Sequence, residues 1–140
     1  MADAKCVFCG LIAGPDFAGK IFEDKISAAF LDHRPLFPGH CLLIPKLHVE
    51  TLSGLPARLT GPFFRRAQQL AAAVEKAMDA QGTFVAMNNR VSQSVPHLHV
   101  HIVPRRRGDG LRGFFWPRTK YASEEELRKV RDRIAAELES

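Results

Sequence analysis

Three histidines at alternate positions constrain this chain more than any other feature. Residues 97–102 read His-Leu-His-Val-His-Ile, so histidine and apolar residues alternate throughout the segment. Because successive side chains of a β-strand point to opposite faces, His97, His99 and His101 would share one face of a strand. The opposite face would be apolar and could pack on a core. The histidine face must meet a cleft, a metal ion or water.

Three interpretations of this histidine face are open. The strand could be half-exposed and carry its histidines by coincidence, although strict alternation of an uncommon residue makes that improbable. The three imidazoles could bind a metal ion, because neutral imidazole is a common ligand. They could also perform acid–base or nucleophilic chemistry. An imidazole with a pKa of about 6.5 offers both a lone pair and a proton at neutral pH.

Patterns elsewhere in the chain predict a domain of the α+β class. Gly61 and Pro62 open a long helix with one apolar face, since proline is tolerated in the first turn, and Gly82 is the expected stop. Ser123 precedes three acidic residues in the form of a capping box, which predicts a C-terminal amphipathic helix. Separated strands and helices are typical of α+β domains. Short strands are expected at residues 20–23, 27–32, 40–44, 83–87 and 97–103.

Length and composition favour one globular domain. The chain has 140 residues, of which 46% are hydrophobic and 25% charged, which is ordinary for a globular protein that buries a core. Apolar runs such as residues 70–74 are far shorter than the roughly 18 residues of a membrane span. Residues 1–5 lack the apolar region of a secretory signal. An odd number of cysteines, three, argues against a disulfide framework. We therefore expect a cytoplasmic protein.

Positive charge is concentrated behind the histidine segment. The formal net charge is +5, and residues 105–120 contain six basic residues and one acid. A local cationic segment favours a phosphate-bearing partner, although a solvated basic surface gives the same pattern.

The histidine segment and its surroundings resemble the histidine triad (HIT) family. The signature His-x-His-x-His is present with apolar residues between the histidines. The resemblance extends from about Cys6 to about Arg105 and implies a HIT-like α+β fold, an antiparallel sheet of about five strands with a long helix, to which the C-terminal helix is added. It also implies one HIT domain over residues 1–140, with an extension over about 105–140, and a homodimer. The matching upstream blocks are residues 30–32, 38–40, 43–46, His48 and 93–95.

The resemblance implies a covalent reaction at phosphorus. HIT proteins act on the α-phosphate of nucleoside 5′-phosphate derivatives. By motif position His99 would be the nucleophile, held by a main-chain carbonyl, and water would hydrolyse the nucleotidyl-histidine. His101 would line the phosphate site and assist the leaving group, and His97 completes the catalytic triad. Gln93 and Ser94 would hydrogen-bond the phosphate oxygens.

The resemblance also implies a nucleoside site. Asp32 matches the acid that binds the ribose hydroxyls, and its alternative role is to cap a turn. Phe8, Leu11 and Phe30 stand where the family walls the base, and plain core packing is their alternative. Asn88 matches a polar residue that reaches the phosphate in the Hint branch, although the following loop looks shorter than in that branch.

A zinc site is implied by the N-terminal cysteines. Cys6 and Cys9 form a C-x-x-C like that of many bacterial HIT proteins, where the pair joins two histidines around zinc. The matching histidines are His48 and His97, and two thiolates with two imidazoles satisfy tetrahedral zinc without an open position, so the ion would be structural. A thioredoxin-like redox pair is less favoured because no strand precedes it. Cys41 is interpreted as a small buried hydrophobe.

The implied function is hydrolysis of a nucleoside 5′-phosphate derivative, with AMP released from a diadenosine polyphosphate. That substrate is expected because residues 105–110 look more like the Fhit branch than Hint, and the arginines at 105–107 could hold distal phosphates. A Hint-like phosphoramidase is the alternative. A lesser variant is a phosphorylase, which would use inorganic phosphate instead of water. Rivals are a nucleotide-binding module without turnover and a catalytic metal on all three histidines. The expected partners are an adenine nucleotide and a second copy, with no membrane. Nucleic acid is unlikely as a partner, because no zinc-finger ligands follow the triad.

Overall fold

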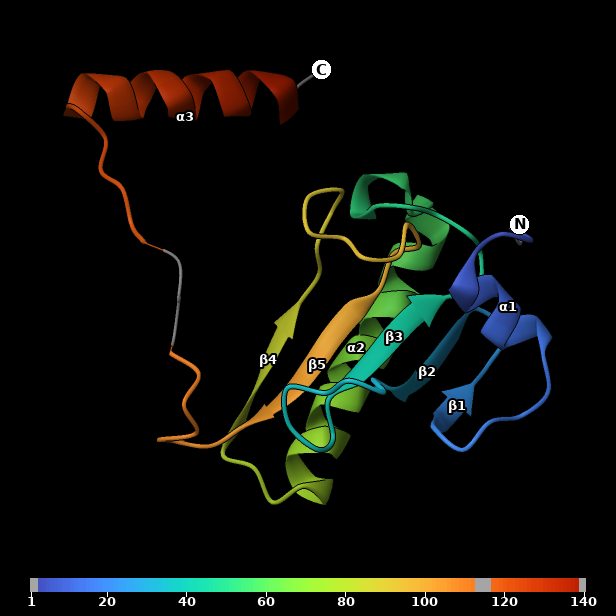
Figure 1. Cartoon of the computed structure of the whole chain (residues 1–140). Coiled ribbons are helices and arrows are strands. Elements are labelled where there is room, and N and C mark those ends of the chain that lie inside the picture. Colours follow the sequence, from blue (N-terminus) through green and yellow to red (C-terminus); the bar gives the residue numbers. More distant parts are fainter. Residues whose placement is uncertain (1–2, 113–116, 139–140) are drawn as a thin grey trace. The chain divides into compact units, whose positions relative to one another are not determined.

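The computed structural model describes residues 3–112 and 117–138. The chain divides into two compact units, Met1–Asp109 and Gly110–Ser140, and each is described by itself. The second unit contains α3 (Glu124–Leu138) (Figure 1). The first unit contains α1 (Val7–Ala13), β1 (Lys20–Glu23), β2 (Ser27–Leu31), β3 (Cys41–Pro45), the short 3-10 helix η1 (Leu52–Gly54), α2 (Ala57–Ala77), β4 (Gly82–Ala86) and β5 (Val100–Arg105).

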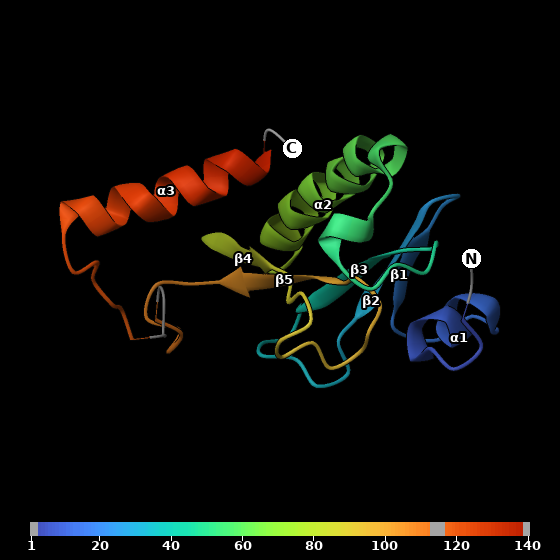
Figure 2. The same ribbon diagram turned by 90° about the horizontal axis from the view of Figure 1, so that it is seen from above.

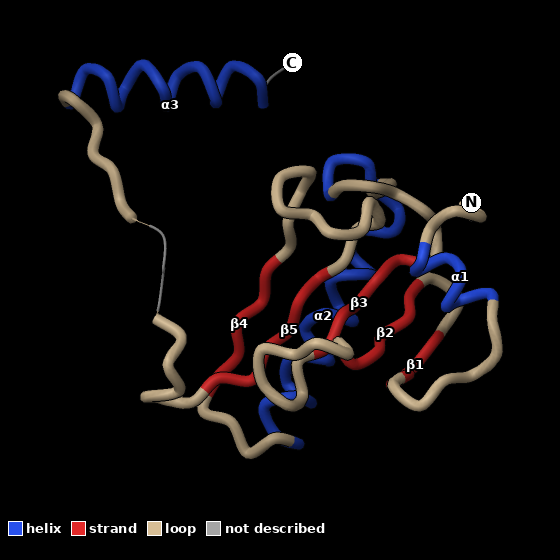
Figure 3. The backbone as a smooth tube through the Cα atoms, in the orientation of Figure 1, coloured by secondary structure: helices blue, strands red, loops and turns tan. Residues whose placement is uncertain are grey.

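The five strands form one antiparallel sheet in the order β1-β2-β3-β5-β4 (Figure 3). The predicted α+β class and the five-stranded antiparallel sheet are therefore confirmed. In the register of the central strands, Leu42 of β3 lies opposite Phe30 of β2 and opposite His101 of β5. This pairing brings the last triad histidine beside residues that are distant in sequence.

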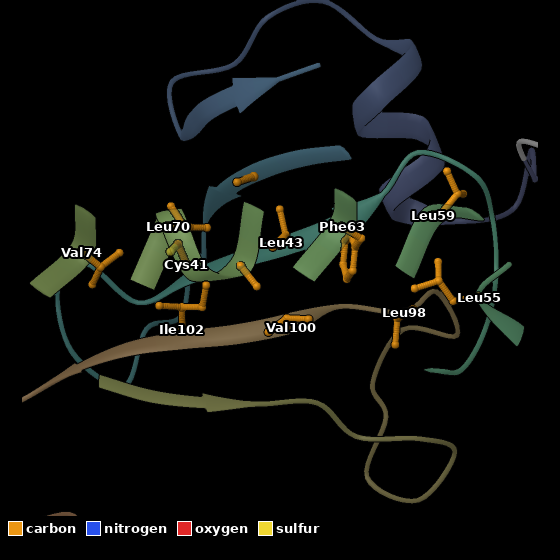
Figure 4. Close-up of a cluster of buried hydrophobic side chains, with 12 residues drawn as sticks. Cys41, Leu43, Leu55, Leu59, Phe63, Leu70, Val74, Leu98, Val100 and Ile102 are labelled. Atoms are coloured by element: carbon orange, nitrogen blue, oxygen red, sulfur yellow. The ribbon is translucent and has the colours of Figure 1, made fainter. Parts of the chain in front are cut away.

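The helix α2 covers one face of the sheet, and the larger core lies between them (Figures 2 and 4). Phe63, Leu70 and Val74 of α2 point toward Leu43 and Ile102 of the strands (Figure 4). Burial of such side chains stabilises the fold by roughly 1.5–3 kcal/mol each relative to exposure. The helix and the sheet thus form a rigid support for the opposite face.

Both ends of α2 differ from the sequence prediction. The helix begins at Ala57 instead of Gly61, because the buried Leu59 extends its apolar face toward the core, and Pro62 lies inside it. It ends at Ala77 instead of continuing to Gly82, which starts β4. The chain turns at Asp79, whose φ is 50°, a left-handed conformation that aspartate tolerates better than most residues.

The helix α1 was not predicted, and it belongs to the other face of the sheet. It is only seven residues long and contains a glycine, and its N-cap is Cys6, whose Sγ accepts the N–H of Cys9 at 3.4 Å. Phe8 and Cys9 of α1 pack in a second buried cluster with Phe30 of β2 and residues of β3. A thiol cap is not among the usual helix-start signals, which are serine, threonine, aspartate and asparagine.

The triad strand begins later than predicted. The strand β5 starts at Val100, so His97 lies in a bend and His99 in the irregular segment before the strand. There the N–H of Leu98 bonds to the carbonyl of Val49 at 2.7 Å instead of to a neighbouring strand. The separation of the two faces nevertheless holds. Leu98 and Val100 belong to the core beneath α2, while the rings of His97 and His99 pack against Phe8 of the other face.

The predicted C-terminal helix is present as α3. The hydroxyl of Ser123 accepts the N–H of Glu126 at 3.1 Å, which confirms the predicted cap, and no residue of α3 within the described part is buried. In the described parts of the chain, no helix has both the length and the apolar character that crossing a membrane requires. The sequence also predicts that the aromatic residues at 114–116 pack against the sheet or a dimer partner, but they lie outside the described residues.

Candidate active site and metal centre

A cavity of about 680 Å³ opens on the face of the sheet that carries α1. Most of its wall is apolar, and polar side chains gather along one part of it. Seven residues singled out from the sequence line this cavity together: Phe8, Leu11, Phe30, Asp32, Ser94, His99 and His101.

His99 is held in one tautomer by the main chain. Its ring is 2% exposed, and Nδ1 lies 2.7 Å from the carbonyl oxygen of His97. A carbonyl oxygen only accepts hydrogen bonds, so Nδ1 carries the proton and Nε2 keeps a lone pair. Phe8 packs edge-on against the ring, with centroids 5.2 Å apart, and fixes its plane. In the neutral ring, His99 therefore presents Nε2 as an oriented nucleophilic nitrogen, and the residue lines the cavity.

His101 is oriented by a second histidine, His40. The N–H of Leu36 donates to Nδ1 of His40 at 3.0 Å, so His40 carries its proton on Nε2. That Nε2 lies 3.0 Å from Nδ1 of His101 and donates to it, which leaves the proton of His101 on Nε2. Burial, reinforced by the neighbouring His99 and His40, lowers the pKa of His101 to about 4. At neutral pH His101 is thus an uncharged N–H donor.

The sequence pattern gave His40 no role beyond membership in a matching block. A histidine directly before a strand that pairs with the triad strand was the available signal, since Leu42 faces His101 in the register. Burial lowers the pKa of His40 as well, against the opposing charge of Asp32, whose Oδ2 lies 3.7 Å from His40 Nε2.

Asp32 lines the cavity and also caps the turn after β2. Its Oδ1 accepts the N–H of Arg34 at 2.9 Å, which is the turn-capping role considered from the sequence. The same residue lines the cavity, so both roles are compatible. His33 lines the cavity too, and the sequence pattern did not single it out.

Gln93 and Asn88 do not line the cavity, although both were expected near the phosphate. The side chain of Gln93 donates to the carbonyl of Glu50 at 2.6 Å and accepts the N–H of Arg90 at 2.8 Å. Asn88 donates to the carbonyl of Ser92 at 3.2 Å. These amides hold together the loop that places Ser94 in the cavity wall.

The arginines at 105–107 lie at the far end of β5. Arg105 is the last residue of β5, so it stands roughly 20 Å along the strand from His99. Its guanidinium makes two bonds to Asp109, at 2.6 and 3.0 Å. The guanidinium of Arg106 donates to the carbonyl of Met78. Their placement does not support the contact with substrate phosphates that the sequence suggested for them.

Four side chains converge beside the cavity as a candidate metal centre. The ligand atoms of Cys6, Cys9, His48 and His97 all lie within 4.8 Å of one another. Nδ1 of His97 is 3.3 Å from Cys6 Sγ, 3.6 Å from Cys9 Sγ and 3.2 Å from Nδ1 of His48. Nδ1 of His48 is 3.4 Å from Cys9 Sγ. The sequence predicted these four residues as one site, and the structure brings them together.

These distances fit a tetrahedral zinc ion. Zn–N bonds of about 2.05 Å and Zn–S bonds of about 2.3 Å place two ligand nitrogens about 3.3 Å apart and a nitrogen and a sulfur about 3.6 Å apart. The donor set is chemically suitable, since two thiolates and two imidazoles are usual zinc ligands. Burial raises the pKa of the Cys9 thiol, so a cation is needed to hold the thiolate there.

An outer hydrogen bond presents Nδ1 of His97 to this centre. Nε2 of His97 donates to the carbonyl of Pro45 at 2.7 Å, and such a partner fixes the tautomer of a metal-binding histidine. Nε2 of His48 lies 3.8 Å from a carboxylate oxygen of Asp3, which is an ion-pair distance and not a hydrogen bond. Within residues 3–112 and 117–138 the three triad histidines form no common ligand group, which argues against a metal ion on all three.

Comparison with known proteins places these features in a family context. A family model described as "HIT domain" matches residues 17–108. The adenosine 5′-monophosphoramidase of Saccharomyces cerevisiae is 35% identical over 141 residues, which cover 98% of this chain and 85% of the relative. The asymmetrical bis(5′-nucleosyl)-tetraphosphatase of Schizosaccharomyces pombe is 40% identical over 93 residues, which cover 63% of this chain and 50% of the relative.

Solved structures match over nearly the whole chain. A HIT family member from Bacillus subtilis has a TM-score of 0.83 at 32% identity, covering 94% of this chain and 96% of that chain. A zinc-bound histidine triad family protein from Mycobacterium smegmatis has a TM-score of 0.70 at 36% identity, covering 94% of each chain.

Proposed function

This chain belongs to the HIT domain family, and on that premise we propose that it transfers a nucleoside 5′-phosphoryl group first to His99 and then to water. The observation that carries the proposal is the hydrogen bond from His99 Nδ1 to the carbonyl of His97, which leaves Nε2 as a free nucleophile at the cavity wall. The general reaction class is also supported by HIT relatives that are named as nucleotide hydrolases.

The proposed reaction has two displacements at the α-phosphorus. In the first, the Nε2 lone pair of His99 forms a P–N bond while the bond to the leaving group breaks and its electron pair departs with that group. In the second, water attacks the same phosphorus and Nε2 recovers its electron pair. The proton lost by water balances the one taken up by the leaving group. Two easier steps replace one difficult displacement.

His101 and Ser94 are proposed to act on the phosphate. The Nε2–H of His101, fixed by His40, can donate to a phosphate oxygen or to the departing atom. The hydroxyl of Ser94 lines the same cavity and can donate to a second oxygen. Because His101 is neutral, it stabilises developing charge as a hydrogen-bond donor and not as a cation.

The nucleoside is proposed to occupy the apolar part of the cavity. Phe8, Leu11 and Phe30 would wall the base, and Asp32 would accept hydrogen bonds from the ribose hydroxyls. Oδ1 of Asp32 already accepts one main-chain bond, and carboxylate oxygens accept more than one. The proposed product is therefore AMP.

One observation bears on the leaving group. Among residues 3–109 no lysine or arginine lines the cavity, and Arg105 is paired with Asp109 at the other end of β5. A polyphosphate leaving group carries several negative charges, which proteins usually meet with arginine or lysine. The cavity therefore favours adenosine 5′-phosphoramidate over the diadenosine polyphosphate expected from the sequence.

The experiment compares the two substrates directly. AMP release is measured from adenosine 5′-phosphoramidate and from diadenosine tetraphosphate at matched concentrations of zinc-loaded protein. We expect release from both and a higher kcat/KM for the phosphoramidate. A higher kcat/KM for the tetraphosphate would reject the leaving-group preference and keep nucleotidyl transfer. No release from either, with AMP still bound, would favour a nucleotide-binding module.

We also infer that Cys6, Cys9, His48 and His97 hold a structural zinc ion. The spacing of the four ligand atoms and the zinc-bound relative support this assignment. When bound, zinc would supply a cross-link and no open position for water. The four residues would then join the N-terminal helix to the segment that carries the nucleophile.

A further inference from the structure

Cys6 and Cys9 stand where a disulfide can close between them. Cys6 caps α1 and Cys9 lies in its first turn, so their side chains share one side of the helix start. Both Sγ atoms belong to the ligand group whose atoms lie within 4.8 Å of one another. A disulfide needs a separation of about 2.05 Å, which side-chain rotation can supply over so short a loop.

A small cavity gives access to Cys6, and Cys9 lies behind it in the same ligand group. It has a volume of about 170 Å³ and is lined by Cys6, His48 and Ser94, among others. That volume exceeds the roughly 30 Å³ of a water molecule, so a peroxide fits. Cys41 provides a contrast, because it is completely buried in β3 and lines neither cavity. Such a thiol is inert to oxidants.

The thiols are connected to the nucleophile through His97. Its ring joins the cysteines, and its carbonyl accepts the Nδ1–H of His99 at 2.7 Å. A second connection runs through Phe8, which lies between the cysteines in sequence and packs on the rings of both His97 and His99. A change at the cysteines is therefore transmitted both to the tautomer of His99 and to the wall of the base site.

We propose that Cys6 and Cys9 are an oxidative modification site through which a peroxide switches off nucleotidyl transfer at His99. This inference rests on the proposed function. Two thiolates, one hydrogen peroxide and two protons give one disulfide and two water molecules. Cys6 and Cys9 would then no longer hold a zinc ion, because the thiolate is the sulfur form that binds metal. Unlike a thioredoxin-like pair, these cysteines pass no electrons to a substrate.

The disulfide form lacks what holds His97 in place. The Nδ1 atoms of His97 and His48, 3.2 Å apart, would face each other as lone pairs with neither a cation nor a thiol proton between them. The rings then move apart, and the carbonyl of His97 moves with its residue. A displacement of about 1 Å in an active site can reduce a rate roughly 100-fold.

The test uses the zinc-loaded full chain carrying Cys41→Ala, so that only two thiols remain. The protein is treated with hydrogen peroxide and then with a thiol reductant plus zinc. Zinc release is followed with a colorimetric chelator, and disulfide formation as a loss of about 2 Da in intact mass. AMP release from adenosine 5′-phosphoramidate and AMP affinity are measured on the same samples. The chain with its native Cys41 serves as the matched control.

We expect zinc release and disulfide formation together, with AMP release reduced about 100-fold and restored by reductant plus zinc. Three results would overturn the proposal: a disulfide with an unchanged rate, a lost rate without a disulfide, or no reaction with excess peroxide. If the untreated protein releases no AMP, the proposed function fails by itself. In that case, the zinc release, the mass change and the AMP affinity show whether oxidation of the cysteines still alters the nucleotide site.

Discussion

At the scale of single residues, one main-chain hydrogen bond decides which nitrogen of His99 can react. The carbonyl of His97 accepts a hydrogen bond from Nδ1–H of His99, so the proposed nucleophile is oriented without a charged partner. His101 is oriented the opposite way round, because its Nδ1 accepts a hydrogen bond from His40. In the proposed reaction, His99 would meet the phosphate with a lone pair and His101 with a proton.

Replacement of Asp32 tests the ribose site. Asp32→Asn keeps an oxygen for the N–H of Arg34, so the turn survives, but it removes the charge. A hydrogen bond to a charged group contributes about 1.5–3 kcal/mol, so AMP affinity should fall roughly 10- to 100-fold. Calorimetric titration with AMP and with its 2′-deoxy form measures this, with Asp16→Asn as an exposed control. Unchanged affinity for AMP would remove Asp32 from the site.

The depressed pKa of His101 predicts a loss of stability in acid. The unfolded chain takes up a proton near pH 6.5, whereas His101 in the folded protein does so only at about pH 4. The contribution of His101 to the free energy of unfolding is therefore fully present above about pH 6.5. It is lost as the pH falls toward 4, and the loss is at most roughly 3 kcal/mol. The charged or titratable groups that face it are His99, His40 and Asp32.

Urea unfolding of wild type and His101→Asn from pH 7.5 to pH 4 isolates this effect. The zinc centre also weakens in acid because its ligands take up protons, so the informative quantity is the difference between the two proteins. Wild type should lose more stability than the variant across this window. Parallel curves would show that His101 titrates normally in the folded protein.

The sequence predicted the positions of some site residues better than those of others. The proposed ligands Cys6, Cys9, His48 and His97 have side chains that commonly bind zinc, and the structure places them together. Asn88 and Gln93 were expected at the phosphate, yet their side-chain amides donate to main-chain carbonyls. A side-chain amide can hydrogen-bond the main chain of a loop as readily as a ligand, so the residue type alone does not distinguish the two roles.

At the scale of elements, α1 is expected to depend on the proposed metal centre more than on its own sequence. It has seven residues, and helices shorter than about 12–15 residues are marginal in isolation. Its cap is the thiol of Cys6, a proposed zinc ligand, and its buried residues pack on β2 and β3. This explains why helical periodicity did not reveal it: the fold is imposed by contacts distant in sequence.

Removing one ligand should therefore release zinc and loosen α1. Cys9→Ser is expected to abolish stoichiometric zinc, lower the melting temperature and reduce amide-exchange protection in α1 while α2 stays protected, because α2 packs on the other face. Elemental analysis and hydrogen exchange measure these effects, and Cys41→Ala is the matched cysteine control. Full zinc content in Cys9→Ser would refute the four-ligand site.

The strand boundaries show a similar dependence on context. The alternation at residues 97–102 correctly separated a core face from a histidine face, since that pattern reflects burial alone. It did not reveal that pairing begins only at Val100, because His97 and Leu98 bond to other main-chain groups. Periodicity reports which side is buried, and hydrogen-bond partners decide where a strand starts.

At the scale of the whole molecule, β4 is an edge strand of the sheet in the first unit. Val85 of β4 is 46% exposed, and β4 pairs with β5 on one side only. Such edges are usually covered or blunted. The homodimer expected from the family resemblance would cover such an edge strand. Sedimentation should therefore give a mass twice that of the chain, which is 15.6 kDa. Val85→Lys should shift the species toward a monomer. A monomer at all concentrations of wild type would contradict this prediction.

The measurement that tests the central claim most directly is AMP release by His99→Ala beside wild type, on adenosine 5′-phosphoramidate. The variant removes the nucleophile while leaving the zinc ligands in place, and zinc content and AMP affinity verify that it is folded. The covalent route predicts a rate at least about 1,000-fold lower, because removing a nucleophile costs several orders of magnitude. A rate within about tenfold of wild type, in a variant that holds zinc and binds AMP, would contradict nucleotidyl transfer through His99.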